Sequence, residues 1–386
     1  MSSSKRNTCR ACGSDRLRLI FDFGPQPLAG MYPLVPESER PAPRYPLDLT
    51  QCDACALLQV TNLPPIDAVF HDDYRYASST VPDLVQHFTG YADWLTARLP
   101  AGAEVLEFGC NDGVLLAQLE ERGANVVGVD ASDNVAAIAR GRGLDVRTGF
   151  MTPDAVQEQG LEGRFDLITC SNVFAHIDDL GETLAAVRRA LKPDGRFAVE
   201  VHDGEALAAE RQFDTIYHEH LTYFTGATLR RLVEANGFAF VECVRTPMHG
   251  GGLRFLCARG EGRSPPVHDE ERIDGARFAE AIERSAGAVR ALAAEYGPLD
   301  GYGVAGRSQM FVNMTGTADC FARLFDDSPL RQNRFLVGSD VAIGPFGGET
   351  GRACVVLAWN YAASISAKIG ESYEKVFTVL PEPREW

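Results

Sequence analysis

Long apolar runs, an apolar leader and clusters of basic residues are all missing from this sequence of 386 residues. No stretch approaches the roughly 18 apolar residues of a membrane helix, and the first residues, Met-Ser-Ser-Ser-Lys-Arg-Asn, contain no apolar segment of a signal peptide. No run of Lys and Arg exceeds two residues, and the formal net charge is -16. These absences argue against a membrane protein and against a nucleic-acid partner, and they predict a cytoplasmic location.

Length and composition favour a globular protein of several domains. At 386 residues the chain exceeds the roughly 100 to 200 residues of an ordinary domain, so two or three domains are expected. The hydrophobic fraction of 45% and the charged fraction of 23% are ordinary and argue against disorder. Changes of pattern along the chain predict the segments 1–75, 76–265 and 266–386. The sequence does not indicate an oligomeric state.

Four of the ten cysteines form two CxxC pairs, Cys9 with Cys12 and Cys52 with Cys55. Zinc takes four thiolates in a tetrahedron, and each CxxC turn presents two sulfurs together, so the pairs predict a zinc site in the first segment. Four protein ligands leave no open position, which indicates a structural zinc. The alternative is a set of unrelated reduced thiols. The other six cysteines are interpreted as buried thiols: Cys110, Cys170, Cys243, Cys257, Cys320 and Cys354.

Short apolar segments alternate with amphipathic segments from residue 81 onward, which is the pattern of a parallel α/β sheet. A helix-like stretch at 270–295 divides the strands into two series, so two Rossmann-like units in tandem are expected. The predicted strands are 104–108, 125–130, 144–147, 165–170, 195–201, 238–245 and 252–258 in the first series and 299–303, 334–337, 352–358 and 375–380 in the second.

The first of these strands ends in a turn that contains two glycines, Val105-Leu-Glu-Phe-Gly109-Cys-Asn-Asp-Gly113. Glycine at 109 and 113 lets the backbone approach a ligand, and the helix that follows offers free N–H groups. Asp130 ends the next strand, where a carboxylate can accept hydrogen bonds from both hydroxyls of a ribose. A tight turn with a capping aspartate would explain the same residues without a ligand.

The turn and its surroundings resemble motif I of the class I methyltransferases, which use S-adenosylmethionine (SAM). The match includes Asp130, the segment around Asn172 after a fourth strand, and the turn Leu191-Lys-Pro-Asp-Gly195 before a fifth. The resemblance implies that SAM is the cofactor. It also implies that SAM is bound by Glu107, Gly109, Asn111, Gly113, Asp130 and Asn172.

The segment Tyr217-His-Glu-His220 concentrates titratable groups. It is not the HExxH motif of zinc proteases, because Thr222 stands where the second histidine is required, so a catalytic metal is disfavoured. General acid or base catalysis is the functional interpretation, and a surface loop with hydrogen-bonded histidines is the alternative. His176 follows the fourth strand, at the edge of the sheet where ligands bind in open α/β proteins.

Several segments together resemble the deoxysugar C-methyltransferases, and the resemblance covers nearly the whole chain. Its members act on nucleotide-linked 4-keto-6-deoxysugars, usually dTDP-sugars of antibiotic pathways. They combine an N-terminal zinc module with a SAM domain and a C-terminal Rossmann-like domain. The segments that carry the resemblance are the two CxxC pairs, the turn at 105–113, Ser171-Asn-Val-Phe-Ala-His-Ile-Asp-Asp179, Phe213-Asp-Thr-Ile-Tyr-His-Glu-His-Leu-Thr-Tyr-Phe224 and His249-Gly-Gly-Gly-Leu-Arg254.

This resemblance implies roles for individual residues. His220 would remove the proton at C3 of the sugar, Tyr217, Glu219 and His176 would line the same pocket, and Tyr76 would lie over the active site. The chemistry is coherent, because a ketone at C4 acidifies the C3–H bond and one base can then form an enolate. The enolate carbon attacks the methyl group of SAM, a step that depends mainly on alignment.

The C-terminal glycine loop departs from the family pattern. Relatives typically carry Gly-Tyr-Gly-Ala, a small residue, Lys and Gly, whereas this chain reads Gly301-Tyr-Gly-Val-Ala-Gly-Arg307 and lacks the Lys. We expect the loop to hold the pyrophosphate of the sugar nucleotide through Gly303, Gly306 and Arg307. Two aspartates at 326–327 complete the arrangement of a dinucleotide site, so NADPH binding and simple packing are alternatives.

The sequence therefore predicts a SAM-dependent C-methyltransferase that acts at C3 of a nucleotide-linked 4-keto-deoxysugar. One rival hypothesis is a bifunctional enzyme that also reduces the 4-keto group with NADPH. Another is a catalytically silent sugar-nucleotide-binding partner protein, against which Asp130 and the intact Tyr217–His220 segment argue. The nucleotide base and the stereochemical course at C3 are not specified by the sequence.

Overall fold

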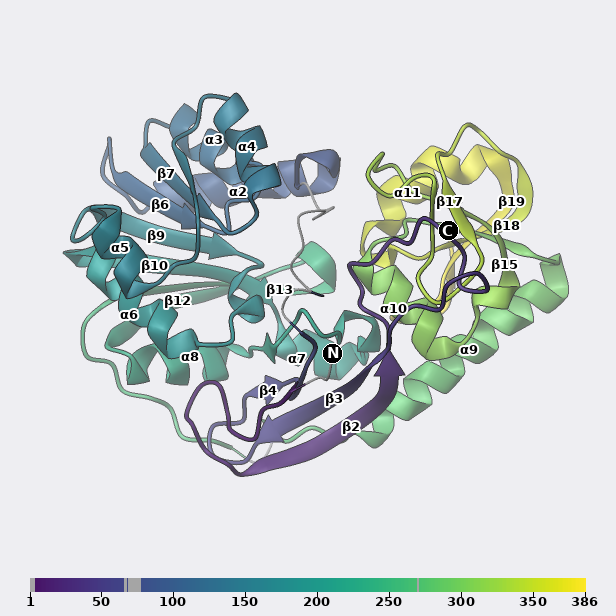
Figure 1. Cartoon of the computed structure of the whole chain (residues 1–386), viewed down its shortest axis with the longest axis horizontal. Helices are drawn as coiled ribbons and strands as arrows, with labels where there is room; N and C mark the ends of the chain where they lie inside the picture. Colours follow the sequence, from purple (N-terminus) through teal and green to yellow (C-terminus); the bar gives the residue numbers. More distant parts are fainter. Residues whose placement is uncertain (1–3, 66–67, 69–77, 269–270) are drawn as a thin grey trace.

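A computed structural model describes residues 4–65, 68, 78–268 and 271–386 (Figure 1). Two α/β units stand side by side, and the N-terminal strands β2 (Leu17–Gln26) and β3 (Tyr45–Cys52) extend from one unit to the other beneath them. Tyr76, which the family resemblance places over the active site, lies outside the described residues. Within the described segments, no helix has the length and apolar character needed to cross a membrane.

The N-terminal segment forms a small antiparallel sheet. Its order is β11-β4-β3-β2, where β11 (Thr222–Tyr223) comes from the middle of the chain. Alternating burial along β2 and the fully buried Leu47 and Leu49 of β3 show one face packed against a core. The strands that the N-terminal segment itself contributes are β1 (Ser4–Lys5), β2 (Leu17–Gln26), β3 (Tyr45–Cys52), β4 (Leu58–Gln59) and β5 (Asn62–Leu63).

The central sheet has seven strands in the order β12-β13-β10-β9-β6-β7-β8. All run parallel except β13, which is antiparallel to both neighbours. Every strand predicted for the first series is present, because apolar runs bounded by Gly and Asp turns mark each one. The strands are β6 (Glu104–Phe108), β7 (Asn125–Asp130), β8 (Val146–Thr148), β9 (Phe165–Ser171), β10 (Leu191–His202), β12 (Phe238–Thr246) and β13 (Gly252–Arg259).

Helices cover both faces of this sheet. The first, α2, begins at Pro82, whose fixed φ suits the first helical turn, and it buries Leu84, Phe88, Tyr91 and Leu95 on one stripe. The helices of the unit are α2 (Pro82–Thr96), α3 (Val114–Glu121), α4 (Asp133–Gly141), α5 (Pro153–Glu158), α6 (Leu180–Ala190), α7 (Gly204–Glu210) and α8 (Gly226–Ala235).

The C-terminal unit is a second, mostly parallel sheet in the order β16-β17-β15-β14-β18-β19-β20. From β14 the chain passes through α10 to β15 on one side, while β18 lies on the other side, so the strand order reverses at β14. The elements are α9 (Ala276–Tyr296), β14 (Leu299–Tyr302), α10 (Gly306–Thr315), β15 (Phe321–Phe325), β16 (Arg334–Phe335), β17 (Ala342–Gly344), β18 (Gly351–Val356), α11 (Ala362–Ile369), β19 (Tyr373–Thr378) and β20 (Arg384–Glu385).

The three parts of the chain share apolar cores. One cluster of buried side chains joins Leu47 of β3 to Phe278 of α9 and Phe311 of α10. The rings of Phe23 and Phe278 also meet edge to face, with 6.1 Å between their centroids. The N-terminal sheet is therefore packed into the C-terminal unit. The predicted limits of the three domains are not tested by this packing and stay a prediction.

Candidate active site

The four cysteines of the two CxxC pairs come together at one end of the N-terminal sheet. Their sulfurs all lie within 4.8 Å of one another, with Sγ–Sγ distances of 3.5 Å for Cys9–Cys55 and 3.6 Å for Cys12–Cys52. A tetrahedral zinc with Zn–S bonds of about 2.3 Å would separate its sulfurs by about 3.8 Å, so the cluster fits zinc. Hydrogen bonds among the sulfurs lower the pKa of Cys52 and raise the pKa of Cys55, so in the metal-free cluster the thiols share protons that a metal would displace.

The SAM loop follows β6, and its glycines are required by backbone geometry. Gly109 and Gly113 have φ values of 67° and 81°, which side-chain-bearing residues rarely adopt. A Cβ at Gly109 would lie 2.2 Å from Val173, and one at Gly113 would lie 2.5 Å from Leu144. Positive φ and close packing on these neighbours therefore both require glycine at the two positions.

Carboxylates gather around this loop. Asp130 accepts hydrogen bonds from the backbone N–H groups of Asn111 and Ser132, both at 2.8 Å. Buried oxygens of Glu107 (Oε2) and Asp112 (Oδ1) have no hydrogen-bond partner among the described residues. Burial and the nearby carboxylates raise the pKa of Glu107 well above its usual range. Unpartnered acidic oxygens suit a ligand that carries positive charge, and SAM carries a sulfonium and an amino group.

Two asparagines predicted to contact SAM hold special positions at strand ends. Asn111 and Asn172 have φ values of 51° and 56°, in the left-handed region that asparagine tolerates better than most residues. Asn111 Oδ1 accepts a hydrogen bond from the N–H of Ser78 at 3.0 Å. Asn172 comes directly after β9 and lines a large cavity, so it connects the SAM loop side of the sheet to that cavity.

This cavity has a volume of ≈ 580 Å³ and is lined by residues from the N-terminal segment, the central unit and the C-terminal unit. The N-terminal segment contributes Gly30, the central unit contributes Asn172 and His220, and the C-terminal unit contributes Gly303 and Lys368. Strands β9, β10, β14 and β15 all have their carboxyl ends at this cavity. Ligands bind at the carboxyl ends of the strands in open α/β sheets.

Tyr217 and His220 form a hydrogen-bonded pair in the cavity wall. The Tyr217 hydroxyl lies 2.8 Å from His220 Nε2, and the two rings stack with centroids 4.0 Å apart. His220 Nδ1 lies 2.9 Å from the carbonyl oxygen of Thr215, which can only accept, so Nδ1 carries the proton and Nε2 is the basic nitrogen. Burial lowers the pKa of His220 well below 6.5, with His176 as a further cause. His220 is therefore a neutral base at ordinary pH.

His176 lies beside this pair, as the position of its segment after β9 had predicted. Its ring centroid is 4.9 Å from that of His220, and the planes are nearly perpendicular. Burial lowers the pKa of His176 to about 4. The segment is fixed because the N–H of Leu221 donates to the carbonyl oxygen of Ala175 at 2.8 Å. Two neutral imidazoles thus share one wall of the cavity.

Glu219 and its neighbour His218 face different surroundings. Glu219 Oε1 accepts a hydrogen bond from the N–H of Gly30 at 3.0 Å, while its buried Oε2 has no partner among the described residues. Burial raises the pKa of Glu219. His218 donates through Nε2 to the carbonyl oxygens of Tyr45 and Pro46, each at 3.2 Å. Glu219 therefore belongs to the cavity, and His218 attaches the segment to the N-terminal sheet.

His202 is a cavity residue that the sequence analysis did not select. It ends β10, and its Nε2 lies 2.8 Å from Gln212 Oε1. The Gln212 amide nitrogen donates to Glu210 and to the carbonyl of Gly250, so Gln212 Oε1 is an acceptor and His202 Nε2 carries the proton. Burial lowers the pKa of His202 to about 3. His202 stands at the carboxyl end of an apolar strand, and His176 follows the end of another. A histidine at such a strand end was the sequence pattern that could have identified His202.

Arg307 has a different role from the one expected. The sequence assigned it to a phosphate, but its guanidinium forms a bidentate ion pair with Asp214, at 2.9 and 3.0 Å. It also lies over the ring of Trp359, whose Nε1 donates to the same carboxylate at 2.9 Å. Asp214 is only 1% exposed. The arginine therefore joins the C-terminal unit to the central unit, and a phosphate could reach it only by competing with a buried carboxylate.

The C-terminal glycine loop lies at the point where the strand order of its sheet reverses. Gly303 has φ 83°, and a Cβ there would lie 2.6 Å from Ala358. Gly306 begins α10, whose first turn has no side-chain cap and lines the cavity. Asp326 accepts the N–H of Val304 at 2.7 Å and pairs with Arg331. The carboxylate expected to hold a dinucleotide ribose is thus used inside the protein.

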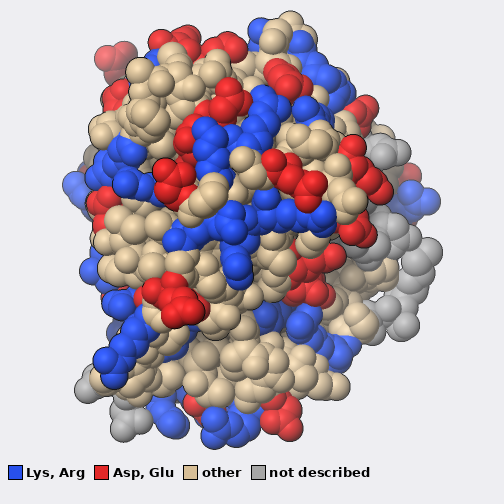
Figure 2. Space-filling view, turned by 90° about the vertical axis from the view of Figure 1, so that its left-hand side faces the viewer, with Lys and Arg blue, Asp and Glu red and all other residues tan. Residues whose placement is uncertain are grey.

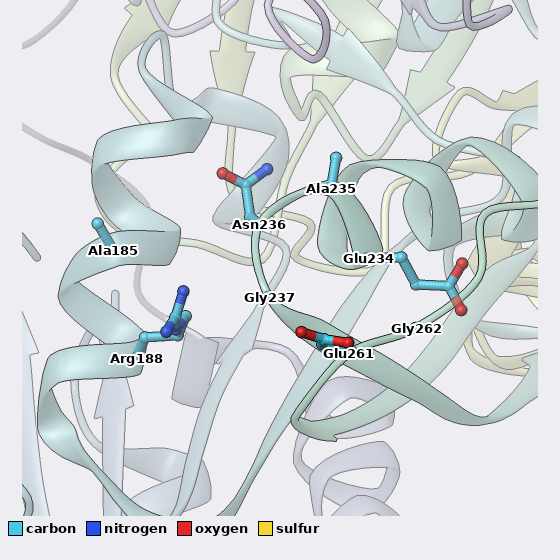
Figure 3. A pocket seen from close by; sticks show the side chains of 8 residues that line it. All are labelled: Ala185, Arg188, Glu234, Ala235, Asn236, Gly237, Glu261 and Gly262. Atoms are coloured by element: carbon cyan, nitrogen blue, oxygen red, sulfur yellow. The ribbon is translucent and has the colours of Figure 1, made fainter.

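The molecular surface carries both signs of charge. Figure 2 shows Lys and Arg side chains in a band across one face, with Asp and Glu side chains directly beside them. A second pocket lies between α6, the end of α8 and the segment after β13. Figure 3 shows Arg188, Glu234, Asn236 and Glu261 around Gly237 in this pocket. None of its residues lines the large cavity. We therefore assign it no part in the chemistry.

The strand order of the central sheet, the carboxylate-rich loop after β6 and the cavity at the carboxyl edge define a class I methyltransferase with additional parts at both ends. Comparisons with known families agree. Residues 77–243 match a family model described as "Methyltransferase domain", residues 9–70 one described as "Putative zinc binding domain", and residues 247–380 one described as "C-methyltransferase C-terminal domain".

The chain is similar over nearly its whole length to C-methyltransferase NovU of Streptomyces niveus, with 31% identity over 403 residues that cover 97% of this chain and 96% of that protein. The chain belongs to the SAM-dependent C-methyltransferase family. Ubiquinone biosynthesis O-methyltransferase of Pseudomonas aeruginosa (strain UCBPP-PA14) is 33% identical over 111 residues, covering 27% of this chain and 47% of that protein. Among solved structures, the PH0226 protein of Pyrococcus horikoshii OT3 is 18% identical in sequence. The match covers 49% of this chain and 99% of the PH0226 chain, with a TM-score of 0.42.

Proposed function

We propose that the protein methylates C3 of a nucleotide-linked 4-keto-deoxysugar, with dTDP as the favoured nucleotide, in the biosynthesis of a deoxysugar of an antibiotic. The observation that carries the proposal is the shared cavity. It joins the end of β9, next to the SAM loop, to the Tyr217–His220 pair and to the uncapped first turn of α10. A base, a methyl donor and a place for phosphate groups are the three elements that this reaction needs.

His220 acts as the base. Its Nε2 takes the proton from C3, and the electron pair of the C–H bond becomes the enolate that the C4 carbonyl stabilises. In the structure the single lone pair of Nε2 accepts from Tyr217, so the Tyr217 hydroxyl first turns its hydrogen to the C4 oxygen, where it stabilises the enolate, and this frees Nε2 for the C3 proton. When bound, SAM supplies an electrophilic methyl group to the enolate carbon. Asp130 and Asn172 hold the cofactor, and the cavity aligns C3 with it.

The C-terminal unit binds the nucleotide part of the substrate. Backbone N–H groups in the first turn of α10 and the positive end of its dipole suit the diphosphate. Gly303 allows the loop to turn sharply before this helix. The zinc of the Cys9–Cys55 cluster holds the N-terminal sheet, which contributes Gly30 to the cavity and supports Glu219. Zinc has no part in the chemistry, because the cluster supplies four ligands.

Incubation with a dTDP-4-keto-2,6-dideoxysugar tests the proposal directly. Mass spectrometry of the product should show the gain of one methyl group in the presence of SAM, at C3, without a requirement for NADPH. A product that is also reduced when NADPH is added would support the bifunctional hypothesis. Binding of the sugar nucleotide with no methylation and no exchange of the C3 hydrogen for deuterium would support the silent partner protein and contradict the proposal.

A further inference from the structure

Among the residues that the structure describes, three Lys or Arg side chains line the cavity, and two of them are held by buried carboxylates. Arg307 pairs with Asp214 and Arg331 pairs with Asp326, and these carboxylates are 1% and 3% exposed. Moving either arginine to a ligand would leave a buried carboxylate without its counterion, which is strongly unfavourable. The third cation, Lys368, has different surroundings.

Lys368 forms a triangle of short contacts with Tyr302 and Asp327. Its Nζ lies 2.7 Å from the Tyr302 hydroxyl and 2.5 Å from Asp327 Oδ1, and the hydroxyl donates to the same Oδ1 at 2.5 Å. The side chains of Lys368 and Asp327 are 46% and 53% exposed. An ion pair this exposed contributes little stability, because water screens it, so Lys368 can exchange Asp327 for another anion at small cost.

The triangle stands at the carboxyl edge of the C-terminal sheet. Tyr302 ends β14, Asp327 follows β15 on the adjacent strand, and Lys368 comes from the last turn of α11. The uncapped first turn of α10 lines the same cavity, so backbone N–H donors and an exchangeable ammonium face one space. Phosphate oxygens are the ligand group that both kinds of donor prefer.

We propose that Lys368 leaves Asp327 to pair with the phosphate groups of the substrate and thereby sets the affinity for the nucleotide. This inference rests on the proposed function for the chemical class of the ligand. It supplies a lysine from α11 where the glycine loop itself has none. Asp327 is then the internal counterion that keeps the ammonium in place before substrate binds, and Tyr302 fixes the direction of both.

Calorimetric titration of the full-length protein with thymidine, dTMP, dTDP and inorganic pyrophosphate tests this role. Lys368→Met should weaken dTDP and pyrophosphate binding by about tenfold, the size expected for one charge-assisted contact, and dTMP by less. Thymidine binding should change by less than about twofold, because thymidine carries no phosphate. Lys368→Arg should restore most of the affinity, and SAM affinity should be unchanged in both variants.

Asp327→Asn separates ligand binding from a structural role of the pair. If Lys368 serves the phosphates, removing its counterion should leave dTDP affinity unchanged or raise it by up to about fivefold. Lys375→Met is the matched control, since Lys375 is a 40%-exposed lysine paired with Glu385 outside the cavity. It should bind all four ligands like the wild type.

Equal losses for thymidine and dTDP in Lys368→Met would overturn the inference, and so would equal losses in Lys368→Met and Asp327→Asn. Wild-type protein that binds neither dTDP nor pyrophosphate would overturn it as well. The proposed function is judged separately by methyl transfer to the dTDP-sugar. Transfer that proceeds normally in Lys368→Met with an unchanged KM would reject the role of Lys368 while the proposed function stands.

Discussion

Glu219 and Gly30 lie 189 positions apart in the chain and are joined by a hydrogen bond of 3.0 Å from the glycine N–H to the glutamate Oε1. The bond links the segment after the long N-terminal strand β2 to the segment that carries the proposed base. It leaves the second carboxylate oxygen of Glu219 buried and available to a ligand. The N-terminal part of the chain, which carries the four-cysteine cluster, is therefore also a wall of the cavity.

We expect one equivalent of zinc per chain. Replacing Cys52 and Cys55 together by Ser removes two ligands from a four-sulfur site, so the metal should be lost and methyl transfer should fall by at least about tenfold as the Gly30 wall loosens. Elemental analysis and a transfer assay give both values. Cys243→Ser, outside the cluster, is the control. Full zinc content in the double variant would show that the four cysteines do not hold the metal.

His220→Asn should abolish methyl transfer and leave SAM binding nearly intact. The substitution removes the basic Nε2 from the cavity, whereas none of the SAM-loop residues contacts this side chain in the described hydrogen bonds. Exchange of the C3 hydrogen for deuterium isolates the proton-removal step. His268→Asn, at an exposed position, is the matched control. Normal exchange in the His220 variant would identify another group as the base.

Asp130→Ala should weaken SAM binding by at least about tenfold and leave nucleotide binding unchanged. Its carboxylate both holds the N–H groups of the SAM loop and stands where a ribose is bound in Rossmann-type sites. Calorimetry with SAM and with dTDP measures the two affinities. Asp133→Ala removes an exposed aspartate a few positions further on and should have no such effect. Equal SAM affinity in the two variants would contradict the assignment.

Arg307→Ala should mainly lower the free energy of unfolding, and its effect on the binding of phosphate groups should be smaller. Removing the guanidinium leaves Asp214 buried without its partner, which typically costs about 3 to 5 kcal/mol. Urea unfolding followed by fluorescence measures the loss. Arg352→Ala breaks an exposed pair with Glu374 and should cost less than about 1 kcal/mol. A fully stable Arg307→Ala protein with weakened dTDP binding would restore the phosphate role predicted from the sequence.

Proton removal should remain fast when the pH falls through 6.5. An ordinary histidine gains a proton there and stops acting as a base, but burial keeps the pKa of His220 well below 6.5 and that of His176 near about 4. The rate of deuterium exchange at C3 should therefore be nearly constant from pH 8 to pH 6 and should fall only at lower pH. Half of the rate lost at pH 6.5 would mean that the base is exposed to water.

The central unit was predictable because its signals are local. Most of its strands are apolar runs that are followed by or end in Gly, Asp or Asn, and the fold class follows from their alternation with amphipathic segments. The long N-terminal strands β2 and β3 were not predicted, since Gly24-Pro25 and Pro46 interrupt their pattern. Strands β15 and β17 were also missed: the exposed Ala322 and Arg323 interrupt the apolar pattern of β15, and β17 has only three residues.

Parts of the site depend on contacts that no local pattern reveals. Asp214, 93 positions before Arg307, forms the ion pair that links the arginine to the central unit, and no local pattern indicates this partner. Lys368 reaches the cavity only because α11 packs beside β18, and nothing in its own segment marks it. The grouping of Tyr217, Glu219 and His220 was predictable from their density, but the direction of each side chain was not.

The order in which the chain is made has a consequence for how the cavity is completed. Domains generally fold as they are synthesised, N-terminal parts first. The strands of the central sheet are complete by Arg259, whereas the N-terminal sheet packs on α9 and α10, and α11 is made later still. The wall that carries Gly30 therefore gains its packing partners only after the central sheet has been made. The cavity is enclosed only when synthesis of the chain is nearly complete.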